Sequence, residues 1–298
     1  MAVIHTTVPP ELISLLESHL PNSLPLLRRL QFTRFPGGQR PTARIIVAAP
    51  PHPSSPANFA AAYLDFGSGI ETSLFLFSTL ETGSKTPEDK NVSETQIVAI
   101  IDAVKQINKE QSENRGYSGA VLVGTLATVV RDVLFEKGVK VQPRADYEYE
   151  KWLFKVDEVP DFDVTLPDGA GWETANEHDC EVVVSRTHIP RQVKTLLTFP
   201  SLVLKLQDGT PIAWSFLGTD GSLSSLHCEP PYRKRGYAKA IASKLFKTGT
   251  RAYGPDGWAS ADVAPDNLGS KGMCKSLGGR HAWNCSWNII RLDDEDES

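Results

Sequence analysis

The sequence predicts a mixed, mostly antiparallel sheet flanked by helices (α+β) in the C-terminal half, and a second α/β domain before it. The length of 298 residues suits two domains, because single domains commonly hold about 100–200 residues. In the C-terminal half, two Asp-Gly pairs, which favour hairpin turns, separate three strand-like runs. The runs lie at residues 201–206, 211–217 and 222–228. This pattern indicates an antiparallel meander, and helical segments lie before and after it.

In the N-terminal half, leucines at helical spacing over residues 10–30 predict two short helices divided near Pro21. Apolar runs at 43–50 and 73–80 predict strands, with a loop between them. Ser93 and Gln96 fit a capping box, so we expect the next helix to begin at Ser93. Further along, residues 119–138 predict an apolar strand or helix followed by a helix, and residues 149–156 predict a strand.

The segment 158–171 is rich in Pro, Gly and Asp and therefore predicts a linker. We place a domain boundary there, which gives an N-terminal α/β domain at 1–164, a second domain at 165–293 and an acidic tail at 294–298. The remaining expected elements are helices at 177–187, 190–198, 237–247 and 267–277, a strand at 259–263, and two final short strands at 280–284 and 286–292.

The composition of the chain argues against several classes of partner. A net charge of −5 argues against a nucleic-acid partner and slightly favours cationic substrates. The four cysteines form no C-x-x-C pair, so we expect free thiols and no metal site. Without a basic leader or a long apolar run, we expect a cytoplasmic protein with no membrane partner. The oligomeric state does not follow from the sequence.

The turn at residues 230–238 joins a predicted strand to a predicted helix and carries three consecutive cations: Arg233, Lys234 and Arg235. Backbone N–H groups and the positive dipole end of a helix N-terminus attract anions such as a pyrophosphate. Gly236 would let the backbone approach such a ligand closely. A solvated basic turn without a ligand is the alternative.

Two patterns resemble the GNAT superfamily of acyl-CoA transferases. Arg233, Gly236 and Ala238 match its [Q/R]-x-x-G-x-[G/A] signature, and Asn267 with Ser270 resembles its Asn-x-x-Ser/Ala helix start. The sequence from residue 213 to residue 238 is most similar to the glycine N-acyltransferase-like branch, in which a degenerate GNAT half precedes the active half. The N-terminal domain is therefore expected to be a degenerate GNAT-like half.

The resemblance implies how an acyl-CoA co-substrate, most simply acetyl-CoA, would be held. Backbone groups of Leu226, His227 and Cys228 would pair with the pantetheine, and backbone amides of residues 234–238, including Tyr237, would hold the pyrophosphate. Lys234 and Arg235 would reach phosphates, while Arg233 could equally brace the loop. Asn267 would bind the pantetheine arm or, as the alternative, cap the following helix.

Catalytic groups are less evident. His227 and Glu229 are the titratable residues at the end of the predicted strand 222–228, and we name His227 as the candidate base, with a structural role as the alternative. Cys274 stands where relatives place an acidic Tyr, and packing is its alternative. The expected function is acyl transfer to the amine of a small molecule. The alternatives are an inactive acyl-CoA sensor or interaction module, and an acetyltransferase acting on protein lysines or N-termini.

Overall fold

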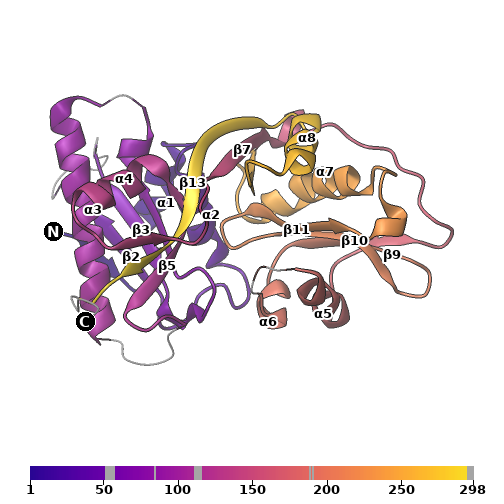
Figure 1. Ribbon diagram of the computed structural model, residues 1–298, viewed down its shortest axis with the longest axis horizontal. Helices are drawn as coiled ribbons and strands as arrows, with labels where there is room; N and C mark the ends of the chain where they lie inside the picture. The colour runs from indigo at the N-terminus through magenta and orange to yellow at the C-terminus, as the bar shows by residue number, and fades with distance from the viewer. Residues whose placement is uncertain (51–57, 84, 111–115, 188, 190, 294–298) are drawn as a thin grey trace. The chain divides into compact units, whose positions relative to one another are not determined.

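The computed structural model describes residues 1–50, 58–83, 85–110, 116–187, 189 and 191–293 (Figure 1). These form two compact units. The N-terminal unit comprises Met1–Leu30, Gln39–Tyr149 and the chain from Trp283 onward, and the C-terminal unit comprises Gln31–Gly38 and Glu150–Ala282. This division differs from the single boundary expected between residues 164 and 165, because the chain returns to its first unit at its end.

The N-terminal unit is built on a sheet with the strand order β1-β2-β3-β4-β5-β13, and β6 pairs with β13. Neighbouring strands are antiparallel except β4 and β5, which run parallel and meet at Leu74↔Val123. The strands are β1 (Val3–His5), β2 (Arg44–Ala48), β3 (Ala60–Leu64), β4 (Leu74–Ser78), β5 (Ala120–Ala127), β6 (Val141–Pro143) and β13 (Arg280–Arg291).

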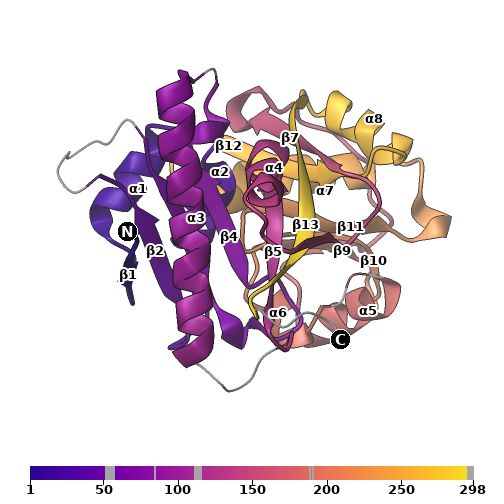
Figure 2. The same cartoon turned by 60° about the vertical axis from the view of Figure 1, so that its left-hand side comes forward.

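Helices cover both faces of this sheet, as the buried clusters show. α1 (Pro10–Glu17) and α2 (Leu24–Phe32) pack with alternate residues of β2 and β3 on one face. α3 (Pro87–Glu110) and α4 (Thr128–Glu136) pack on the other face, where α3 lies along the sheet (Figure 2). Because β3, β4 and β5 are buried along their whole length, their sequences are nearly continuous apolar runs rather than alternating.

The strands of the C-terminal unit lie in the sheet in the order β7-β12-β11-β10-β9-β8. β11 and β12 run parallel, and the other neighbouring pairs are antiparallel. α7 lies on one face of this sheet and α5 and α6 lie on the other (Figure 1). The strands are β7 (Tyr149–Lys155), β8 (Gly171–Glu173), β9 (Ser201–Lys205), β10 (Pro211–Leu217), β11 (Ser222–Cys228) and β12 (Trp258–Val263), and the helices are α5 (Glu177–Arg186), α6 (Val193–Leu196), α7 (Tyr237–Gly249) and α8 (Leu268–Ser276).

The two units repeat one order of elements. In each, a strand, two helices and three strands lead to a helix, then to a strand parallel to the third of those three, and then to another helix. In each unit, the strand that pairs with the last strand of this series does not follow it directly in the chain. β7 precedes the C-terminal unit's other strands yet pairs with β12, and residues 285–291 of β13 pair with β5 in the N-terminal unit.

The predicted fold class is confirmed, but several element predictions were wrong. β3 lies where a loop was expected, because its sequence AAAYL is short, alanine-rich and buried on both faces, without alternation. α3 begins at Pro87, and Ser93 is a buried residue within it rather than its cap. β13 is one strand and not two. Residue 190 and the acidic tail at 294–298 lie outside the described residues.

Candidate acyl-CoA site

The strand β11 separates from its parallel neighbour β12 part-way along its length. The two strands pair only at Ser222↔Ser260 and Leu223↔Ala261, whereas β11 continues to Cys228. All seven residues of β11 are half-buried, in contrast to β10, which is buried throughout. The second half of β11 therefore has one edge that β12 does not cover, where an extended ligand could add as a strand.

The backbone of β11 presents alternate residues to this edge. The Glu229 N–H donates to Ile212 O on the β10 side (2.9 Å), so the backbone groups of Leu226 and Cys228 point the other way. The Cys228 carbonyl accepts a hydrogen bond from Arg233 Nε (2.9 Å), which shows Arg233 bracing the loop. His227 pairs with Trp214 on β10, so its side chain rather than its backbone is available for chemistry.

A bulge in β11 marks the point where the strands part. The register with β10 shifts between Trp214 and Phe216, and Ser225 has a φ of 53°, which is unusual for a residue other than glycine. The Ser225 Oγ is buried and has no hydrogen-bond partner among the described residues. Buried polar atoms normally have partners, so this hydroxyl marks a place where a ligand or water would complete the bonding.

The basic turn after β11 leads through a short 3₁₀ turn (Pro230–Tyr232) into α7, whose N-cap is Gly236. Gly236 has a φ of 85° and no side chain to cap the helix, so the first-turn amides face outward without a side-chain acceptor. Arg233, Lys234 and Arg235 are all exposed beside it. The Arg235 guanidinium lies over the Tyr232 ring, 5.7 Å from its centroid. This arrangement suits a pyrophosphate.

Three further predicted residues have defined positions. Tyr237 is buried and its hydroxyl donates to Thr165 O (2.9 Å), which leaves only its backbone for a ligand, while Ala238 is half-buried in the first turn. Asn267 Oδ1 accepts from the Ser270 N–H (3.0 Å), so Asn267 caps α8 as the alternative interpretation held.

Cys274 lies in the apolar core of the C-terminal unit and is fully buried. Burial, with the nearby Asp262 carboxylate as a smaller cause, raises the pKa of its thiol to about 12. A buried thiol with so high a pKa is a poor proton donor to a leaving thiolate whose own pKa is near that of a free thiol, about 8.5. This geometry favours packing as its role.

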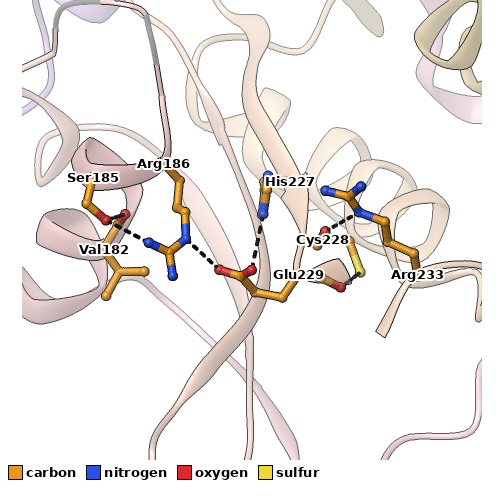
Figure 3. Close-up of polar contacts among 7 residues, drawn as sticks. All are labelled: Val182, Ser185, Arg186, His227, Cys228, Glu229 and Arg233. Atoms are coloured by element: carbon orange, nitrogen blue, oxygen red, sulfur yellow. Dashed lines mark hydrogen bonds and ion pairs between the residues drawn. The ribbon is translucent and has the colours of Figure 1, made fainter. Parts of the chain in front are cut away.

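His227 lies on the opposite face of β11 from Leu226 and Cys228, which pack toward α7. Its ring stacks on Trp214, with centroids 4.7 Å apart and planes 20° from parallel. The Glu229 carboxylate is beside it: Oε2 lies 3.7 Å from His227 Nε2, and Oε1 accepts from Arg186 Nε on α5 (3.0 Å; Figure 3). The sequence did not indicate the role of Arg186, since 43 residues separate it from Glu229.

A second arginine also reaches β11 from the segment that joins α5 to α6. Arg191 donates through Nη2 to Ser224 Oγ at 3.3 Å. This face of β11 is thus bridged near its middle at Ser224 and at its end at Glu229. Among the described residues, no group of three His, Cys, Asp or Glu side chains could hold a metal ion, and no helix is long and apolar enough to cross a membrane.

Two models of known protein families match the chain. The model of the acyl-CoA N-acyltransferase verG N-terminal domain matches residues 1–152, more than half of the chain. The chain belongs to this acyl-CoA N-acyltransferase family. The FR47-like protein model matches residues 202–288, which include β11, the basic turn and α7. The protein is therefore a GNAT-type N-acyltransferase that uses acyl-CoA and an amine acceptor.

Solved structures share the two-unit fold at low sequence identity. A Drosophila protein has a TM-score of 0.64 at 16% identity, covering 94% of each chain. A GCN5-related N-acetyltransferase from Sphaerobacter thermophilus has a TM-score of 0.57 at 13% identity, covering 100% of this chain and 98% of the other. A tandem GNAT protein from the clavulanic acid biosynthesis pathway has a TM-score of 0.55 at 10% identity, covering 99% of each. No curated protein matches the sequence.

Proposed function

We propose that this acyltransferase moves an acetyl group from acetyl-CoA to the amine of a small molecule, at the uncovered edge of β11. The observation that carries the proposal is the continuity of this edge with the Gly236 turn. The edge offers the backbone of Leu226 and the N–H of Cys228, and the turn offers outward amides and three cations. Together they suit acetyl-CoA, in which the amides of the pantetheine arm lead to a pyrophosphate.

The acceptor would lie on the His227 face of β11. Arg191 bridges to Ser224 and Arg186 bridges to Glu229, so the strip between them is closed at both ends. A peptide laid along β11 would have to displace both bridges, whereas a small amine need not displace either. This is our reason for favouring a small molecule over a protein lysine or N-terminus.

In the reaction we propose, the amine nitrogen attacks the thioester carbonyl carbon, the carbon–sulfur bond breaks, and coenzyme A leaves as a thiolate. The nitrogen loses one proton, which His227 accepts and returns to solvent. The thiolate takes a proton from solvent, so no other acid is required. A free amine is largely protonated at neutral pH, so a base near the bound amine also favours its reactive neutral form.

The test is release of free coenzyme A from acetyl-CoA in the presence of candidate acceptors, with the acetylated product identified by mass. Small amines, a lysine peptide and a peptide with a free N-terminus form the panel. We expect turnover with members of the first group. Acetylation of the peptides alone would refute the small-molecule acceptor, and release with longer acyl-CoA but not acetyl-CoA would refute the choice of acetyl.

A further inference from the structure

His227 is fixed by its surroundings more firmly than a surface histidine would be. Its ring stacks on the fully buried Trp214, and its Nε2 atom is buried with no hydrogen-bond partner in the part of the chain that the structure describes. The Glu229 Oε2 atom lies 3.7 Å from that nitrogen. This distance is too long for a hydrogen bond, but contacts of this kind in ligand-free enzymes commonly shorten when substrates bind.

Glu229 is itself held in place from two directions. Its backbone N–H donates to Ile212 O (2.9 Å), and its Oε1 atom accepts from Arg186 Nε (3.0 Å). The side chain is only 19% exposed. One carboxylate oxygen is therefore held by Arg186, and the other is directed at His227 (Figure 3).

From this geometry we infer that Glu229, held by Arg186, is a positioning residue for His227. A neutral imidazole carries its proton on one nitrogen, and a carboxylate that faces one nitrogen selects the tautomer with the proton there. Glu229 then fixes the proton of His227 on Nε2 and leaves the Nδ1 lone pair to accept the proton of the attacking amine. Glu229 also stabilises the imidazolium that forms, and takes up no proton itself.

This inference rests on the proposed function, in which His227 accepts the amine proton. It differs from a purely structural role for the same contacts, in which Arg186 and Glu229 would only tie α5 to the end of β11. Both roles predict a loss of stability when the pair is removed. Only the positioning role predicts that the tautomer of His227 depends on residue 229.

Glu229→Gln separates the two roles. The glutamine keeps the side-chain size, and its carbonyl oxygen can still accept from Arg186, but its NH₂ group would then face His227 Nε2 and donate to it. We expect the wild-type imidazole to be protonated on Nε2 and the variant imidazole on Nδ1. The readout is the pair of imidazole nitrogen shifts in protein labelled with ¹⁵N-histidine, assigned by comparison with His227→Gln.

The same variant is then assayed with the best amine found. We expect kcat to fall about 100-fold, as for loss of assistance to a general base, with KM for acetyl-CoA within about twofold of the wild-type value. Arg186→Ala should lower kcat in the same direction by less. The matched control is Asp161→Asn, which neutralises another carboxylate of the same unit, paired with Lys247 at 2.6 Å, and should leave kcat and the His227 shifts unchanged.

Each outcome decides something. A His227 tautomer that is the same in wild type and Glu229→Gln overturns the inference, whatever the activity. A changed tautomer with unchanged kcat also overturns the inference, because the position of the His227 proton then does not matter to turnover. If no amine is acetylated by the wild type, the proposed function fails, yet the nitrogen shifts still show whether Glu229 positions His227.

Discussion

Gly236→Ala should weaken acetyl-CoA binding, because the glycine adopts a backbone conformation that places the first-turn amides of α7. Its φ is 85°, in the left-handed region, where a residue with a Cβ costs about 1–2 kcal/mol. An added Cβ would also approach Val164 Cγ1 at 3.0 Å, a contact that a small shift of the valine relieves. If the turn relaxes to avoid the strain, its amides leave the pyrophosphate and the dissociation constant rises about 5- to 30-fold.

Gly209→Ala provides the matched control for backbone strain. Gly209 has the same φ of 85°, in the hairpin between β9 and β10, and an added Cβ there would meet nothing within 4 Å. Both variants should lose similar thermal stability, but only Gly236→Ala should lose affinity in isothermal titration with acetyl-CoA. Equal affinities for acetyl-CoA in the two variants would refute the role assigned to this turn.

Three further predictions concern the rest of the molecule. Ile290→Ala removes a fully buried side chain of β13 and should lower the stability of the N-terminal unit by about 3 kcal/mol. In hydrogen exchange, the amides of β5 (120–127) should then exchange about 100-fold faster, while those of β10 (211–217) do not change. Equal acceleration in both strands would contradict the assignment of β13 to the N-terminal unit. Acetyl-CoA should protect the half-buried Cys228 from alkylation. Cys274 should not react in the folded protein, because burial raises the pKa of its thiol to about 12. Mass spectrometry of the labelled cysteines tests both expectations. Titration should give one acetyl-CoA per chain, because α3, the counterpart of α7, has two acidic residues in its first turn; a stoichiometry of two would refute this.

The helix ends explain that last prediction. In α3 the Asp89 N–H donates to Thr86 Oγ1 (3.1 Å), and Glu88 and Asp89 carry negative charge where a phosphate would lie. Hydrogen bonds from the Thr86 hydroxyl and, second, from Asn58 lower the pKa of Asp89 below its ordinary value. In α7 the corresponding position is a glycine with no capping side chain. The two units thus share an order of elements, but the first turn of α3 carries two acidic residues and that of α7 carries none.

The sequence predicted the C-terminal meander well because Asp-Gly turns and apolar runs are local signals. It did not predict β3, since a strand buried on both faces has no alternation to detect, nor that β13 is a single strand. The binding of an anion at the Gly236 turn stays a prediction, and of the two roles open to Arg233 the contact with the Cys228 carbonyl favours the brace of the loop. The contact of Arg186 with Glu229 was beyond sequence analysis, because folding alone brings α5 to the end of β11.

The placement of β13 affects the order in which the molecule can form during synthesis. Domains generally fold as units in the order in which they leave the ribosome. Here the N-terminal unit emerges first, but the strand that pairs with β5 is made only after the C-terminal unit is nearly complete. Until then β5 has an uncovered apolar edge, which is a site where strands of other chains could add. The N-terminal unit is therefore synthesised first but completes its sheet last, and the edge of β5 stays uncovered for as long as the C-terminal unit is being translated.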